Sequence, residues 1–135
     1  MFLIHIVNNQ MVSIQSVRKM ALSFLGVEEK PHFEVASFRN KNRIFATLWE
    51  KDHKVMLKLS LVSQSVYCSY NASIFFSVPG GWGKQGATFV DLKKVESKIF
   101  KEALSTAYDE SIKPAKKAKK IDTKRPNYTE LVIPA

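Results

Sequence analysis

The side chains best suited to chemistry in this chain of 135 residues are basic ones at or beside predicted turns, together with a tryptophan. The candidate nucleic-acid contacts are Arg39, Lys41, Arg43, Lys51, Lys54, Lys58, Trp82 and Lys84. Guanidinium and ammonium groups bind phosphate, and an exposed indole can stack on a base. Because basic residues at turns are exposed whether or not they bind anything, solvated turns are the alternative interpretation.

The glycine-rich segment at residues 81–86 matches the spacing G-x-G-x-x-G. A dinucleotide site needs this loop to open a helix whose N-terminus meets the pyrophosphate. Residues 87–92 instead have the composition of a strand, and Gln85 stands where a phosphate-binding P-loop has Ser or Thr. The segment therefore predicts a tight connection between strands and no nucleotide cofactor.

Residues for catalysis or metal binding are scattered. His5, His32 and His53 are far apart, and Cys68 has no second cysteine beside it, whereas metal sites need closely spaced ligands. We therefore expect a protein that is not an enzyme and that carries no metal or cofactor. The single cysteine also favours a reducing compartment, the cytoplasm.

The net charge of +9 is distributed unevenly along the chain. Residues 113–135 contain seven Lys or Arg and two Asp or Glu, a net +5, whereas residues 1–112 contain 14 and ten, a net +4. The longest apolar run near the start, residues 2–7, is far shorter than the ~20 residues of a membrane span. We expect an N-terminal extension over residues 1–12, one domain over 13–113 and a basic tail over 114–135.

Hydrophobic spacing predicts the elements that position these side chains. We expect helices over 14–25, 60–70 and 93–111, the first capped by Ser13, and strands over 34–38, 43–50, 54–60, 74–78 and 87–92. The order α-β-β-β-α-β-β-α predicts an α+β fold of two layers. In it a five-stranded antiparallel sheet has helices on one face.

Alternation along the second and third strands predicts an aromatic outward face. If Ile44, Ala46 and Leu48 point to the helices, then Phe45, Trp49 and Met56 point away from them, as do Thr47 and Lys58. Such a face could bind another protein, form a dimer, stack single-stranded bases or be covered by the ends of the chain. We expect a monomer, with a homodimer as the alternative.

Several ordered motifs resemble the MmcQ/YjbR-like family. They are Leu25-Gly26-Val27-Glu28-Glu29-Lys30-Pro31-His32-Phe33, Ser37-Phe38-Arg39, residues 41–49, and Val78-Pro79-Gly80-Gly81-Trp82-Gly83-Lys84-Gln85-Gly86-Ala87-Thr88. In the last motif Ala87 stands where the family often has an aromatic residue. The resemblance implies a compact, secretion-chaperone-like two-layer domain and DNA binding through a double wing of hairpins. Since no segment predicts a helix with base-reading side chains, we expect weak or shape-based phosphate binding.

Overall fold

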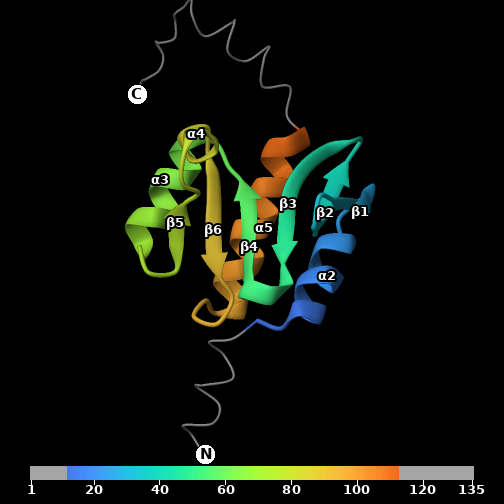
Figure 1. Ribbon diagram of the computed structural model, residues 1–135, viewed down its shortest axis with the longest axis horizontal. Coiled ribbons are helices and arrows are strands. Elements are labelled where there is room, and N and C mark those ends of the chain that lie inside the picture. The colour runs from blue at the N-terminus through green and yellow to red at the C-terminus, as the bar shows by residue number, and fades with distance from the viewer. Residues whose placement is uncertain (1–11, 113–135) are drawn as a thin grey trace, which may run out of the picture.

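Six strands form one open antiparallel sheet in the computed structural model, which describes residues 12–112 (Figure 1). The strands are β1 (Val27–His32), β2 (Val35–Asn40), β3 (Arg43–Trp49), β4 (Lys54–Lys58), β5 (Phe75–Ser77) and β6 (Ala87–Asp91). Their order across the sheet is β1-β2-β3-β4-β6-β5. The predicted α+β class with an antiparallel sheet is confirmed, but the sheet has one strand more than predicted.

Serine caps begin two of the helices at the predicted places. The Oγ of Ser13 accepts a hydrogen bond from the backbone N–H of Ser16, and Ser60 does the same for Ser63, both at 3.1 Å. The helices are α2 (Ile14–Leu22), α3 (Leu61–Tyr70), the short α4 (Gly81–Lys84) and α5 (Ser97–Ile112). A short 3₁₀ segment, η1 (Glu50–Asp52), joins β3 to β4.

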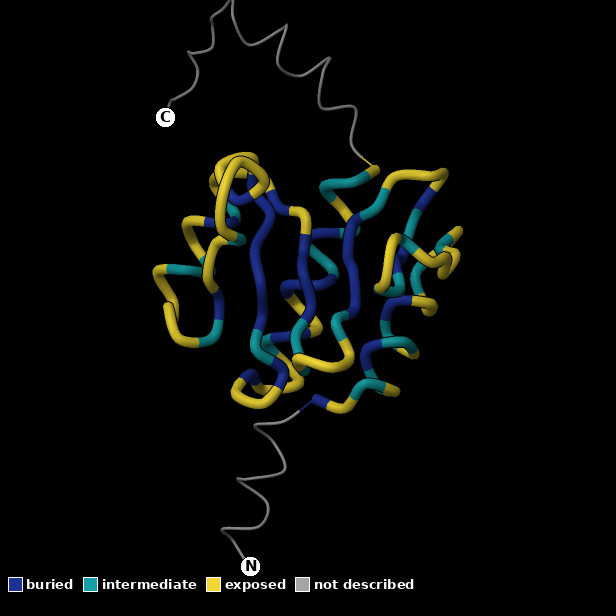
Figure 2. The backbone as a smooth tube through the Cα atoms, in the orientation of Figure 1, coloured by how far each residue is buried: buried dark blue, intermediate teal, exposed yellow. Residues whose placement is uncertain are grey.

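The main hydrophobic core lies between the sheet and the long helices. Side chains such as Val17 of α2, Leu48 of β3 and Leu104 of α5 are almost fully buried in it, and Tyr67 of α3 packs against it. In Figure 1 α5 passes behind β3 and β4, and Figure 2 shows these strands buried along most of their length. The opposite face of the sheet carries a smaller apolar cluster made by Met56, Ala87 and Phe89.

The strand that sequence analysis missed is β1, at the edge of the sheet. It pairs with β2 from Val27 opposite Asn40 to His32 opposite Val35, and most of its residues are exposed. An exposed edge strand needs no alternation of apolar residues, and its outer side tolerates Pro31, which has no N–H to donate. Apolar alternation and the absence of proline, the two usual signals of a strand, are therefore both missing from this segment.

A β-bulge corrects the predicted orientation of Phe45. Phe38 pairs with Ala46 but the next residue, Arg39, pairs with Ile44, so Phe45 is the extra residue of β3. The alternation shifts there, and the Phe45 ring is fully buried, 5.5 Å from Tyr108 and 6.2 Å from Phe24 between ring centroids. The prediction that Phe45 faces outward is wrong, and Ile44 lines the open face in its place.

A buried side chain and a close backbone approach hold the glycine-rich segment against its neighbours. The buried Gln64 of α3 donates from Nε2 to the carbonyls of Gly83 (2.9 Å) and Ala87 (3.1 Å). A Cβ at Gly83 would lie 1.8 Å from the carbonyl oxygen of Val78, closer than atoms can approach. This segment leads directly into β6, as predicted, but Gly81–Lys84 form the short helix α4, which was not predicted and which fixes where Trp82 and Lys84 stand.

Candidate nucleic-acid interface

Most of the predicted contact residues gather at one end of the sheet, which we call the basic end. It consists of Arg39, Lys41, Arg43, Lys58, Lys84 and Trp82. The β2–β3 turn, the end of β4 and the α4 segment before β6 all lie there (Figure 1), because β4 runs antiparallel to both β3 and β6. Lys41 and Asn42 both have positive φ (51° and 70°), as a two-residue hairpin turn requires.

The lysines of the basic end are exposed, whereas the two arginines are already held by hydrogen bonds. Arg39 donates from Nε to the Oγ of Ser37 (2.9 Å), and Arg43 donates from Nη1 to the carbonyl oxygen of Ser111 (2.9 Å). Within residues 12–112, no carboxylate lies at ion-pair distance from Lys41, Lys58 or Lys84. These three ammonium groups are thus available to an anionic partner.

The other predicted residues, Lys51 and Lys54, lie at the opposite end of the sheet. Successive turns of an antiparallel meander point in opposite directions, so the two hairpin tips do not form a single basic surface. Lys54 also has a different partner, since its Nζ lies 3.9 Å from the centroid of the Phe89 ring. At that distance it makes a cation–π contact.

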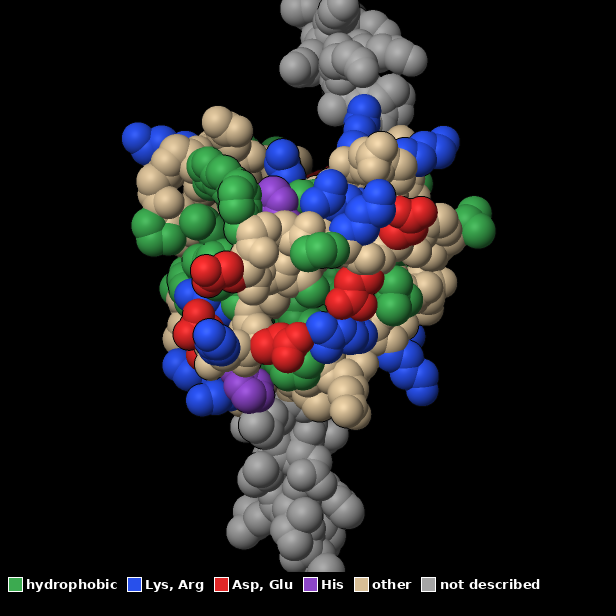
Figure 3. Space-filling model, turned by 45° about the vertical axis from the view of Figure 1, so that its right-hand side comes forward, with side chains coloured by type: hydrophobic (Ala, Val, Ile, Leu, Met, Phe, Trp, Pro, Cys, Tyr) green, Lys and Arg blue, Asp and Glu red, His purple; other side chains and the backbone are tan. Residues whose placement is uncertain are grey.

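A groove of about 1470 Å³ follows the open face of the sheet between the two ends. Its floor includes Trp49 and Met56, which were predicted to face outward, together with Phe89. The groove is bordered by Lys58 and Trp82 at the basic end. Figure 3 shows Lys and Arg side chains along the upper edge of the molecule, and others lower down, where Asp and Glu side chains lie among them.

Carboxylates concentrate at the end opposite the basic end. Glu50 and Asp52 of η1 line the groove there, with Glu34 of the β1–β2 turn on its rim. Lys51 also lines the groove at this end. Positive and negative side chains are mixed at this end, whereas the three lysines of the basic end have no carboxylate at ion-pair distance within residues 12–112, so the basic end suits a polyanion better.

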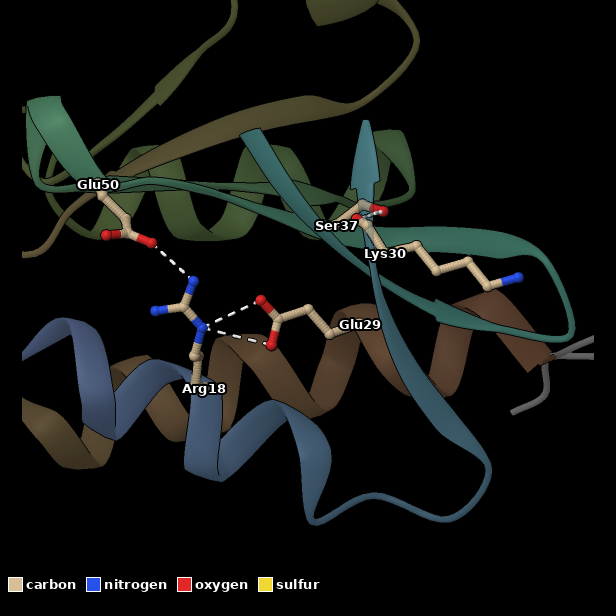
Figure 4. Close-up of polar contacts among 5 residues, drawn as sticks. All are labelled: Arg18, Glu29, Lys30, Ser37 and Glu50. Atoms are coloured by element: carbon tan, nitrogen blue, oxygen red, sulfur yellow. Dashed lines mark hydrogen bonds and ion pairs between the residues drawn. The ribbon is translucent and has the colours of Figure 1, made fainter. Parts of the chain in front are cut away.

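Arg18 of α2 is a residue that sequence analysis missed. Figure 4 shows its guanidinium between two carboxylates, with Nε 3.0 Å from the nearer oxygen of Glu29 and Nη2 2.6 Å from Glu50. The hydrogen bonds to Glu50 and then Glu29 raise the pKa of the Arg18 side chain. Since all three groups are partly exposed, this bridge adds little stability. It places the edge strand and η1 relative to α2, and no local pattern reveals it because Glu50 is 32 residues away.

Metal-ligand clusters and membrane-spanning helices are both absent from the part of the chain that the structure describes, residues 12–112. That part contains no group of three or more His, Cys, Asp or Glu able to hold a metal ion, and no helix long and apolar enough to span a membrane. Cys68 packs, partly buried, against the main core, and burial raises the pKa of its thiol.

Comparison with known proteins places the chain in no group. No protein-family model matches it, and no curated protein matches its sequence. The assignment of function therefore depends on the geometry described above and on the sequence motifs.

Proposed function

We propose that the chain is a non-enzymatic DNA-binding protein that contacts the phosphate backbone with the basic end of its sheet. One observation carries the proposal. Lys41 on the β2–β3 turn, Lys58 at the end of β4 and Lys84 on α4 come from separate elements, yet they lie at one end, exposed and without carboxylate partners among the described residues. Ammonium groups spread along one edge of a protein can each contact a phosphate of the DNA backbone.

Two further features support a polyanion at this end. The C-terminus of α5 lies there too, since Arg43 bonds the carbonyl oxygen of Ser111. The next residues in sequence, 113–135, carry a net charge of +5 (seven basic and two acidic) and lie outside the described residues. Trp82, with 63% of its surface exposed, stands beside Lys84, where its ring could stack on an unpaired base or pack against a sugar.

The proposed binding depends on shape and charge and not on base sequence. α4 has four residues, too few to act as a recognition helix, and the exposed side chains of the basic end are mainly lysines. Contacts to phosphate position a protein on DNA without reading its sequence. The motifs from Leu25 to Phe33 and from Val78 to Thr88 support membership of the MmcQ/YjbR-like family, with its fold and DNA-binding role. The single cysteine supports a cytoplasmic location.

Replacing Lys41, Lys58 and Lys84 together by Ala is expected to weaken binding to duplex DNA about tenfold or more at low salt. The slope of log K against log salt should become shallower by about 2 to 3, because up to three phosphate contacts are lost. Fluorescence anisotropy with a labelled duplex, repeated at several salt concentrations, measures both quantities.

A matched control removes the same charge elsewhere. Lys93, Lys98 and Lys101 are also exposed, but they precede or lie on α5, and none of them is at the basic end or lines the groove. Their triple Ala variant should lose less than about threefold in affinity. Equal losses in the two variants would mean that only net charge matters, and the proposed interface would be abandoned.

A further inference from the structure

Phe33 is the most exposed large apolar side chain in the described part of the chain, with 90% of its surface accessible. It occupies the β1–β2 turn, where His32 pairs with Val35 and only Phe33 and Glu34 lie between them. Its φ is +60°, a region that bulky residues rarely adopt and that glycine enters without cost. The turn thus holds a large apolar side chain in solvent on a strained backbone, which points to a role in contact with a partner.

The groove on the open face offers a receptor for such a side chain. Its apolar floor contains Met56, Phe89 and Trp49, and Phe33 itself lies on its rim. At about 1470 Å³ the groove exceeds the size of a typical small-molecule site. One molecule therefore presents both an exposed aromatic side chain and an apolar groove on the same face.

Charge along the groove favours a second copy of the chain as the occupant. Glu34, Glu50 and Asp52 outnumber Lys51 at one end, and Lys58 lies at the other. Because Glu50 is already paired with Arg18, Glu34 and Asp52 carry most of the negative charge that a partner meets. A two-fold axis that lies between the two open faces, parallel to them and perpendicular to the length of the groove, sets the acidic end of each copy against the basic end of its partner. Such an isologous contact is self-complementary, with every favourable pairing made twice.

We propose that two copies of this chain associate through their open faces, each inserting Phe33 into the groove of the other, with Glu34 of one copy facing Lys58 of the partner. This self-association goes beyond DNA binding. It uses the length of the groove and shares Lys58 with the proposed DNA interface, whereas Lys41 and Lys84 are not among the residues that line the groove.

Sedimentation velocity on the full chain, without nucleic acid, tests this proposal. The mass should rise with concentration from 15.4 kDa toward twice that value. Phe33→Ala should weaken association at least tenfold, about the effect of losing an interface hot spot. Leu25→Ala should not change it, although Leu25 is almost as exposed (86%). A mass that stays at 15.4 kDa at all concentrations, or equal effects of the two variants, would overturn the proposal.

Charge exchange tests the two-fold arrangement separately. Glu34→Lys and Lys58→Glu should each weaken association about tenfold, because like charges then face each other, and the double variant should restore it. A double variant weaker than both single ones would rule out this pairing. The full chain could instead stay monomeric while a chain lacking residues 1–11 self-associates. That result would assign the groove to the N-terminal segment and would also overturn the proposal. These measurements contain no nucleic acid, and Phe33→Ala and Glu34→Lys change no residue of the basic end, so self-association can fail while DNA binding holds, and the reverse.

Discussion

Gly86→Ala is expected to lower the free energy of unfolding by about 3 kcal/mol or more. Two causes act together. Gly86 has a φ of +111°, which a residue with a Cβ adopts only with strain, and an added Cβ would lie 1.8 Å from the carbonyl oxygen of Leu59. Neither β4 nor β6 can move away easily, because Leu59 donates its N–H to the carbonyl of Gly86 at 3.2 Å. Thermal unfolding followed by circular dichroism should show a fall in Tm of roughly 10 °C or more.

Gly81→Ala provides the matched control in the same segment. A Cβ at Gly81 meets nothing within 4 Å, and the residue is not among the glycines with positive φ. Its effect on stability should stay within about 0.5 kcal/mol. If the two variants unfold at the same temperature, residue 86 does not lie as close to Leu59 as the structure shows.

Phe45→Ala is expected to cost about 3 to 5 kcal/mol of folding free energy, because it empties a fully buried site. The ring makes edge-to-face contacts with Phe24 and Tyr108, which themselves stack with their centroids 4.6 Å apart. Removing Phe45 therefore disturbs the contact of β3 with α5 and with the chain that follows α2. Urea denaturation measures the change in the free energy of unfolding.

Leu25→Ala is the control for this variant, since the Leu25 side chain is 86% exposed and should lose less than about 1 kcal/mol. This comparison also decides between two interpretations of residue 45. A residue that faces outward to bind a partner would leave stability nearly unchanged when truncated. A small effect of Phe45→Ala would restore the outward orientation that strand alternation predicts and would argue against the β-bulge.

Local patterns in the sequence predict much of this fold. Ser13 and Ser60 mark the starts of helices, and the turn at Lys41 and Asn42 follows from polar residues between alternating strands. β1 could not be found in this way, because an edge strand exposed on both faces carries no apolar alternation. The bulge at Phe45 was hidden as well, since one extra residue reverses alternation without any change in composition.

The candidate interface was predictable in its residues but not in its geometry. Lys41 and Lys58 are separated by β3 and β4, and Lys84 joins them only because β6 pairs with β4 across the intervening α3 and β5. That pairing is long-range and leaves no local signal. The separation of Lys51 and Lys54 from this group, in contrast, follows from the predicted meander itself, because its successive turns must point to opposite ends of the sheet.

The most direct test of the central claim is the salt dependence of DNA binding by the full chain. Fluorescence anisotropy with labelled duplex DNA, between about 50 and 200 mM salt, should show saturable binding with a log–log slope of −2.7 or steeper, the value for at least three phosphate contacts at about 0.9 each. Several duplexes of unrelated sequence should give similar affinities. Absence of binding at the lowest salt concentration, or an affinity that does not change with salt, would contradict the assignment of the basic end to DNA.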